Sequence, residues 1–230
     1  WCYLGLARHL PDTAIYGLQA TGIQGEAPAS FDAMVADYVA RMRAVQPCGP
    51  YRLLGWSLGG ALAQAMAAAL AAAGETVELL ALMDSYPAAC WEKRPQPQLH
   101  DALVTVLSVN GEVDADADGL PLDNEAIYQR LLRPGSPLAP LGRAALEKLG
   151  QASLHGMRLF RDSRTPAYAG DVLLFRAGRH PGDAPTPADW QPYLQGRLDC
   201  VELDCDHFGM SDPEPMRRIG EELARRLQSI

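Results

Sequence analysis

The chain has 230 residues, of which 48% are hydrophobic and 21% charged, and its formal net charge is −8 at pH 7. This length and apolar content suffice for one domain with a full core. The acidic balance argues against a nucleic-acid surface, which needs a basic face, and against a basic amphipathic patch for anionic membranes. No apolar run reaches the roughly 18 residues that a membrane-spanning helix requires.

The five cysteines are odd in number and scattered, with no CxxC or metal-ligand spacing: Cys2, Cys48, Cys90, Cys200 and Cys205. Free thiols in a reducing cytoplasm are the simplest interpretation, and no metal site is expected. Because the first residue is Trp1 rather than methionine, we also expect the chain to be a piece of a longer polypeptide.

The first part of the chain predicts alternating helices and strands. The expected elements are a helix over 1–10, a strand over 14–19, a helix capped by Ser30, a strand over 51–55, a helix over 57–73 and a strand over 77–83. The last of these helices closes on Gly74, and the last strand is almost continuously apolar, with Glu78 as the exception, as expected when both faces of a sheet are covered. Such an order predicts a parallel α/β sheet.

The alternation stops over 88–166, where helical patterns occur without a convincing strand. The expected elements from there on are helices over 99–109, 124–132 and 143–160, strands over 171–177 and 200–204, and a closing helix over 213–227. A helical insertion of this length within an α/β sheet predicts a lid over 88–166, within a single domain that spans 1–230.

The segment Gly55-Trp56-Ser57-Leu58-Gly59 matches the pattern G-x-S-x-G. It joins a short apolar strand to a long helix, which is the context of a nucleophile elbow, where a serine occupies a sharp, strained turn. The start of the helix favours negative charge, and the Leu58 backbone N–H would donate to a developing oxyanion. A Gly-rich turn with an incidental serine is the alternative interpretation.

A serine hydroxyl needs a general base, and five histidines are candidates. His207 follows the last predicted strand and precedes the last helix, which is where α/β-hydrolases carry the base. His180 also follows a strand and is the rival candidate. A surface or structural role is expected for His9, His100 and His155.

The base in turn needs an orienting carboxylate. Asp84 comes directly after the strand that follows the nucleophile helix, which places it at the same sheet edge as the serine, one strand away. Asp183 and Asp189 follow the next strand, where many α/β-hydrolases carry their acid. On the local pattern Asp84 could instead be a helix cap or a turn former.

Five stretches carry a wider resemblance: "IYGLQATG", "ADYVARMRAVQPCGPYRLLGWSLGG", "LLALMDSYP", "DVLLFRAGR" with the later Trp190, and "DCDHFGM". Through them the chain resembles thioesterase domains of non-ribosomal peptide synthetases along almost its whole length. The resemblance implies an α/β-hydrolase fold, with a mostly parallel sheet flanked by helices and a helical lid insertion. It also favours Asp84 as the acid over Asp183 and Asp189.

The resemblance further implies a serine thioesterase with the triad Ser57, Asp84 and His207. Ser57 would accept an acyl or peptidyl chain from the phosphopantetheine thioester of a peptidyl carrier domain, in the same polypeptide. His207 would act as base and then as acid, oriented by Asp84. Release would follow by hydrolysis or by macrocyclisation. The domain would bind no cofactor of its own.

Three alternatives remain beside assembly-line release. The nearest is a stand-alone editing (type II) thioesterase, which clears misloaded carrier domains. The others are a carboxylesterase or lipase of the same fold, and an inactive hydrolase fold that only docks a carrier.

The family's pattern has one part that this sequence lacks. A strand and a Gly-rich oxyanion loop precede the first helix in the family, so the second oxyanion donor is expected outside the 230 residues. The absent strand would lie between the strands predicted over 14–19 and 51–55. Without the absent strand, these two strands would be too far apart to bond each other, and their facing backbone N–H and C=O groups would stay unpaired in the core. We therefore expect the natural polypeptide to extend N-terminally.

Overall fold

A computed structural model describes residues 3–20, 26–180 and 182–228. The chain forms two compact units. The first, here called the core unit, comprises Trp1–Leu18, Ser30–Lys93 and Phe160–Ile230. The second, here called the helical unit, comprises Gln19–Ala29 and Arg94–Leu159.

The sheet of the core unit has four parallel strands in the order β1-β2-β3-β4. These strands are β1 (Tyr51–Trp56), β2 (Val77–Met83), β3 (Val172–Ala177) and β4 (Leu198–Leu203). Trp56 is paired with Met83, and Met83 with Phe175, so the carboxyl ends of the first three strands are nearly level. Residues that follow these strands therefore meet at one edge of the sheet.

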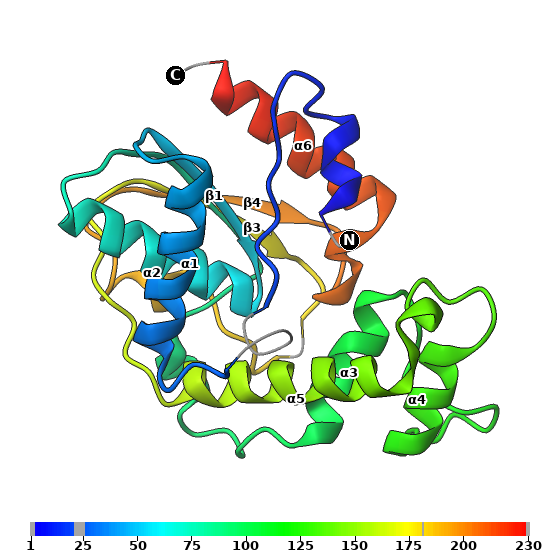
Figure 1. Ribbon diagram of the computed structural model, residues 1–230. Coiled ribbons are helices and arrows are strands. Elements are labelled where there is room, and N and C mark those ends of the chain that lie inside the picture. Colours follow the sequence, from blue (N-terminus) through cyan, green and yellow to red (C-terminus); the bar gives the residue numbers. More distant parts are fainter. Residues whose placement is uncertain (1–2, 21–25, 181, 229–230) are drawn as a thin grey trace. The chain divides into compact units, whose positions relative to one another are not determined.

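Three α-helices lie entirely within the residue ranges of the core unit. They are α1 (Phe31–Val45), α2 (Leu58–Ala72) and α6 (Pro213–Leu227). α2 packs against β1 and β2, and α1 packs against α2 (Figure 1). As predicted, the Ser30 hydroxyl caps α1 by accepting the Ala33 N–H at 3.0 Å. Gly74, just beyond α2, has a φ of +79°, which favours glycine at the end of a helix.

The N-terminal predictions fit less well. Instead of a helix over 1–10, the described residues form a short 3₁₀ helix, η1 (Leu4–Arg8), which packs against α6. The strand predicted over 14–19 is wrong, since these residues have no regular structure. Ile15, Tyr16 and Leu18 are exposed there, and no described strand lies alongside to supply the hydrogen bonds that would make the segment a strand.

The edge of β1 away from β2 also has no strand partner among residues 3–20, 26–180 and 182–228. Direct pairing of the 14–19 segment with β1 would have contradicted the strand predicted to lie between them. The structure shows no such pairing, and the intervening strand stays a prediction.

The helical unit contains the helices predicted between 88 and 166. They are α3 (Leu99–Val109), α4 (Asn124–Leu132) and α5 (Gly142–Arg161), of which the first two match the predicted bounds and the third extends one residue further at each end. All residues of this segment are described, and none is in a strand. Buried leucines and one isoleucine form the core of these helices: Leu103, Leu107, Ile127, Leu131 and Leu146. Within the described ranges, no helix is both long and apolar enough to cross a membrane.

Candidate active site

Ser57 stands at the turn between β1 and α2 with a φ of 55° and a ψ of −124°. A residue other than glycine adopts this conformation only under strain. A Cβ on Gly55 would come within 2.0 Å of the Gly59 carbonyl oxygen, and one on Gly60 within 2.5 Å of the Ser85 Cβ. Gly55 is required because α2 starts tightly against the strand that it leaves, and Gly60 because α2 passes close to Ser85 in the turn after β2. The predicted nucleophile elbow is confirmed as a backbone geometry.

The start of α2 offers a donor beside the serine. Leu58 is the first residue of the helix, so its N–H has no acceptor within the helix. The Ser57 N–H, by contrast, donates to the Met83 carbonyl at 3.0 Å and ties the elbow to the end of β2. The position of Leu58 at the start of α2 is the one expected of an oxyanion donor, and this role stays a prediction.

Asp84 follows directly after β2 and is almost completely buried, with 3% of its surface exposed. Its Oδ2 lies 2.7 Å from His207 Nδ1, while Oδ1 accepts the Ala177 N–H at 3.1 Å and the Tyr86 hydroxyl at 3.2 Å. Burial by itself would raise the pKa of Asp84. The hydrogen bond and charge of His207, together with the Ala177 N–H, outweigh burial and hold this pKa below its ordinary value. Asp84 is therefore a carboxylate at neutral pH.

Burial and the charge of Asp84 raise the pKa of the Tyr86 hydroxyl, so Tyr86 keeps its proton and can donate it in a hydrogen bond to the carboxylate. Asp84 itself has a φ of 43°, a second strained position in the same site. The turn after it is anchored from η4 (Pro187–Trp190), because the buried Trp190 indole N–H donates to the Ser85 carbonyl at 3.0 Å.

His207 lies between β4 and the 3₁₀ helix η5 (Phe208–Ser211), and a third of its side chain is exposed. Its ring packs against that of Trp56, with 5.6 Å between the centroids and 41° between the planes. Because Trp56 immediately precedes Ser57, this contact holds the imidazole beside the elbow. No hydrogen bond joins Ser57 and His207 among the described residues; such bonds are often long before substrate binds.

The structure thus brings three predicted site residues to one edge of the sheet, from the ends of β1, β2 and β4. The carboxylate bonded to His207 is that of Asp84. Asp189, another predicted candidate, instead accepts the Thr186 N–H at 2.7 Å, in the capping box at the start of η4.

The remaining histidines have different surroundings. His100 bonds Asn124 at 3.0 Å and His155 bonds the Pro28 carbonyl at 2.7 Å, both within the helical unit. His9 packs against α6 at Gly220. These three fit the structural role expected of them.

His180 differs from those three, because its Nε2 lies 3.3 Å from Asp84 Oδ1. Sequence reasoning considered it only as a rival base and missed its position at the acid. It also missed the Tyr86 contact, for which the spacing of two residues after Asp84 was the available signal. For the Trp190 contact with Ser85, no local pattern in the sequence gave a signal.

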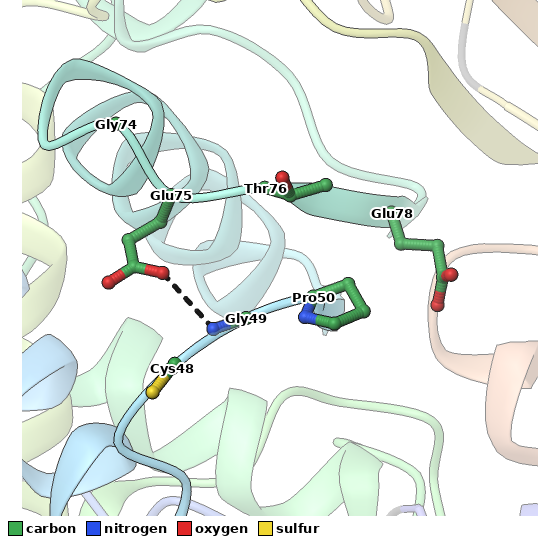
Figure 2. A pocket seen from close by; sticks show the side chains of 7 residues that line it. All are labelled: Cys48, Gly49, Pro50, Gly74, Glu75, Thr76 and Glu78. Atoms are coloured by element: carbon green, nitrogen blue, oxygen red, sulfur yellow. Dashed lines mark hydrogen bonds between the residues drawn. The ribbon is translucent and has the colours of Figure 1, made fainter.

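A surface hollow of about 400 Å³ lies elsewhere, where β1 and β2 begin (Figure 2). It is lined by Cys48, Gly49, Pro50, Gly74, Glu75, Thr76 and Glu78. In Figure 2 the Glu75 carboxylate accepts the Gly49 N–H, at 3.1 Å, and it also pairs with Arg43. The hollow is at the opposite ends of the strands from Ser57, so it is not part of the candidate active site.

A parallel sheet with a strained serine elbow, followed along the chain by an aspartate and then a histidine, is the arrangement of an α/β-hydrolase. The family model for the thioesterase domain matches residues 1–227, so the chain belongs to the thioesterase domain family. Thioesterase domains of non-ribosomal peptide synthetases are among its relatives.

The chain is 39% identical, over 236 residues, to a dimodular nonribosomal peptide synthase of Bacillus subtilis (strain 168). This match covers 100% of the chain and 10% of the synthase, so the chain spans about a tenth of that relative's length. Among solved structures, the NocB thioesterase domain from the nocardicin cluster has a TM-score of 0.67 and 25% identity, and the match covers 99% of this chain and 87% of that one.

The four-domain nonribosomal peptide synthetase holo-AB3403 has a TM-score of 0.82 at 21% identity, and the match covers 97% of this chain and 18% of that one. At this identity the likeness supports the fold alone.

Proposed function

We propose that the chain is a serine thioesterase that takes an acyl or peptidyl chain from a carrier domain and releases it at the end of non-ribosomal peptide synthesis. The observation that carries the proposal is the 2.7 Å bond between Asp84 and His207, beside the strained Ser57, in a chain that matches the thioesterase family over residues 1–227.

In the first step, Ser57 Oγ attacks the thioester carbonyl while His207 Nε2 takes its proton. Asp84 holds the proton on Nδ1, which leaves Nε2 free to act as the base, and its negative charge stabilises the imidazolium that forms. The Leu58 N–H donates to the oxyanion of the tetrahedral intermediate. His207 then gives its proton to the departing thiolate, and an acyl-enzyme on Ser57 is left.

In the second step, water or a nucleophile within the acyl chain attacks the ester on Ser57. His207 again takes the proton from the attacking group and returns it to Ser57 Oγ as the ester bond breaks. Water gives a linear acid, and an internal hydroxyl or amine gives a ring.

The proposed partner is a peptidyl carrier domain, and the relative in Bacillus subtilis, a multidomain synthase, supports a carrier in the same polypeptide. The phosphopantetheine of the carrier delivers the substrate, so the thioesterase needs no cofactor of its own. In this proposal the reaction takes place in the cytoplasm, where the free thiols Cys48, Cys90, Cys200 and Cys205 would stay reduced.

The test is to load a carrier domain with candidate peptidyl chains and to identify the released product by mass. The protein should release product far faster than its Ser57→Ala variant, and the mass distinguishes a linear acid from a ring. Equal release by the two proteins would contradict the proposal. A preference for short acyl groups over peptidyl chains would instead favour the editing thioesterase.

A further inference from the structure

His180 is a nearly buried imidazole to which the triad mechanism gives no task. It comes three residues after the end of β3, and only 11% of its side chain is exposed. Its Nε2 lies 3.3 Å from Asp84 Oδ1, within ion-pair distance but not aligned as a hydrogen bond, and no other partner satisfies this atom among the described residues. A buried polar atom with no other partner calls for an explanation.

The two oxygens of Asp84 face different groups. Oδ2 makes the short bond of 2.7 Å to His207, whereas Oδ1 meets the Ala177 N–H at 3.1 Å, the Tyr86 hydroxyl at 3.2 Å and His180 at 3.3 Å. Ala177 and His180 both come from the end of β3, so this strand supports the carboxylate from the side away from the base.

Contacts at Oδ1 restrict the rotation of the Asp84 carboxylate. A carboxylate held only at Oδ2 can rotate about its Cβ–Cγ bond and lengthen the bond to His207. Groups that direct positive dipoles at Oδ1 resist this rotation. They also replace the water that a carboxylate with 3% exposure has lost.

We propose that His180 is a positioning residue for Asp84: with its proton on Nε2, it places a partial positive charge 3.3 Å from Oδ1, outside hydrogen-bond alignment, and so helps the Ala177 N–H and the Tyr86 hydroxyl to keep Oδ2 on His207. The inference rests on the proposed function, because the orientation of Asp84 matters to turnover only if His207 is the base. His180 does not touch the reacting atoms. It acts through the carboxylate, because its Nε2 lies 3.3 Å from Asp84 Oδ1.

The test uses two amides that differ by one methylene. The side-chain nitrogen of glutamine can occupy the place of a histidine Nε2, whereas that of asparagine is closer to the place of Nδ1. His180→Gln should therefore retain kcat within about twofold, while His180→Asn and His180→Leu should lower it about tenfold. KM should not change, since His180 does not contact substrate. Arg179→Gln, in the exposed position next to it, is the matched control and should leave kcat unchanged.

A second readout separates positioning from mere packing. The His207 Nδ1–H proton, observed by NMR, should move upfield or broaden in His180→Asn and stay in place in His180→Gln, because only the former loosens the bond to Asp84. Thermal unfolding verifies that each variant is folded. If His180→Leu does not fold, the glutamine–asparagine comparison decides.

Equal kcat values for the glutamine and asparagine variants, whether both high or both low, would overturn the inference. This outcome differs from a failure of the proposed function, in which the unmodified protein would release no product, or Ser57→Ala would release as much.

Discussion

Replacement of Asp84 by asparagine tests the polar geometry of the site most specifically. Asparagine has nearly the same shape as aspartate, but one of its two terminal atoms is an NH₂ group, and the surroundings determine where that group goes. The Oδ1 position receives the Ala177 backbone N–H at 3.1 Å, and this donor cannot turn away. The asparagine oxygen must therefore stay there, and the NH₂ group must face His207 Nδ1.

With an NH₂ group at that position, His207 has to accept at Nδ1 and carry its proton on Nε2, which is the wrong tautomer for a base directed at Ser57. The same loss of the correct tautomer in other Ser-His-Asp enzymes lowers kcat about 10⁴-fold, or about 5.4 kcal/mol of transition-state stabilisation. The fold should persist, because the change exchanges one donor–acceptor bond for another at nearly the same volume.

The assay is steady-state release of product from a carrier-bound or small-molecule thioester, together with a thermal melt of each variant. Asp183→Asn and Asp189→Asn are the matched controls, and both should keep kcat. A near-normal kcat in Asp84→Asn, with a collapse in either control, would refute the assignment of the acid.

Three further predictions follow from packing and burial. Gly60→Ala should lower the free energy of unfolding by roughly 1–3 kcal/mol and reduce kcat, because the new Cβ would lie 2.5 Å from the Ser85 side chain. Chemical denaturation measures the loss, with Gly17→Ala as the control because a Cβ there meets nothing within 4 Å. Equal stability of the two variants would contradict the prediction. Iodoacetamide at pH 8 should modify the exposed Cys48 before Cys205, since burial raises the pKa of the Cys205 thiol to about 11; peptide mass mapping showing equal rates would count against this. Backbone amides in the helical unit (94–159) should exchange hydrogen faster than those of the four strands if this segment acts as a lid; protection equal to that of the strands would exclude a gating role.

Many elements of both units were predictable because each carries a local signal. The bounds of β2, α3, α4 and α6 agree with the predicted ranges residue by residue. These segments have strong apolar periodicity or a continuous apolar run, and glycine, proline or polar residues close their ends. The chain order of Ser57, Asp84 and His207 was informative because parallel strands bring their carboxyl ends to one edge.

Other features depend on contacts that a local pattern does not encode. The segment over 14–19 has the composition of a strand, but a strand also needs a neighbour for its backbone hydrogen bonds, and none is present among the described residues. The contact between Trp190 and the turn after Asp84 spans 105 residues of sequence. The contact between His180 and Asp84 likewise arises only once β2 and β3 lie side by side.

The central claim is that Asp84 and His207 activate Ser57 as a nucleophile. A fluorophosphonate probe tests it most directly, because it labels only an activated serine. The account predicts a single adduct on intact protein, mapped by peptide mass to Ser57, absent in Ser57→Ala and formed far more slowly in Asp84→Asn. An adduct that persists in Ser57→Ala, or no adduct on the folded protein, would contradict the claim.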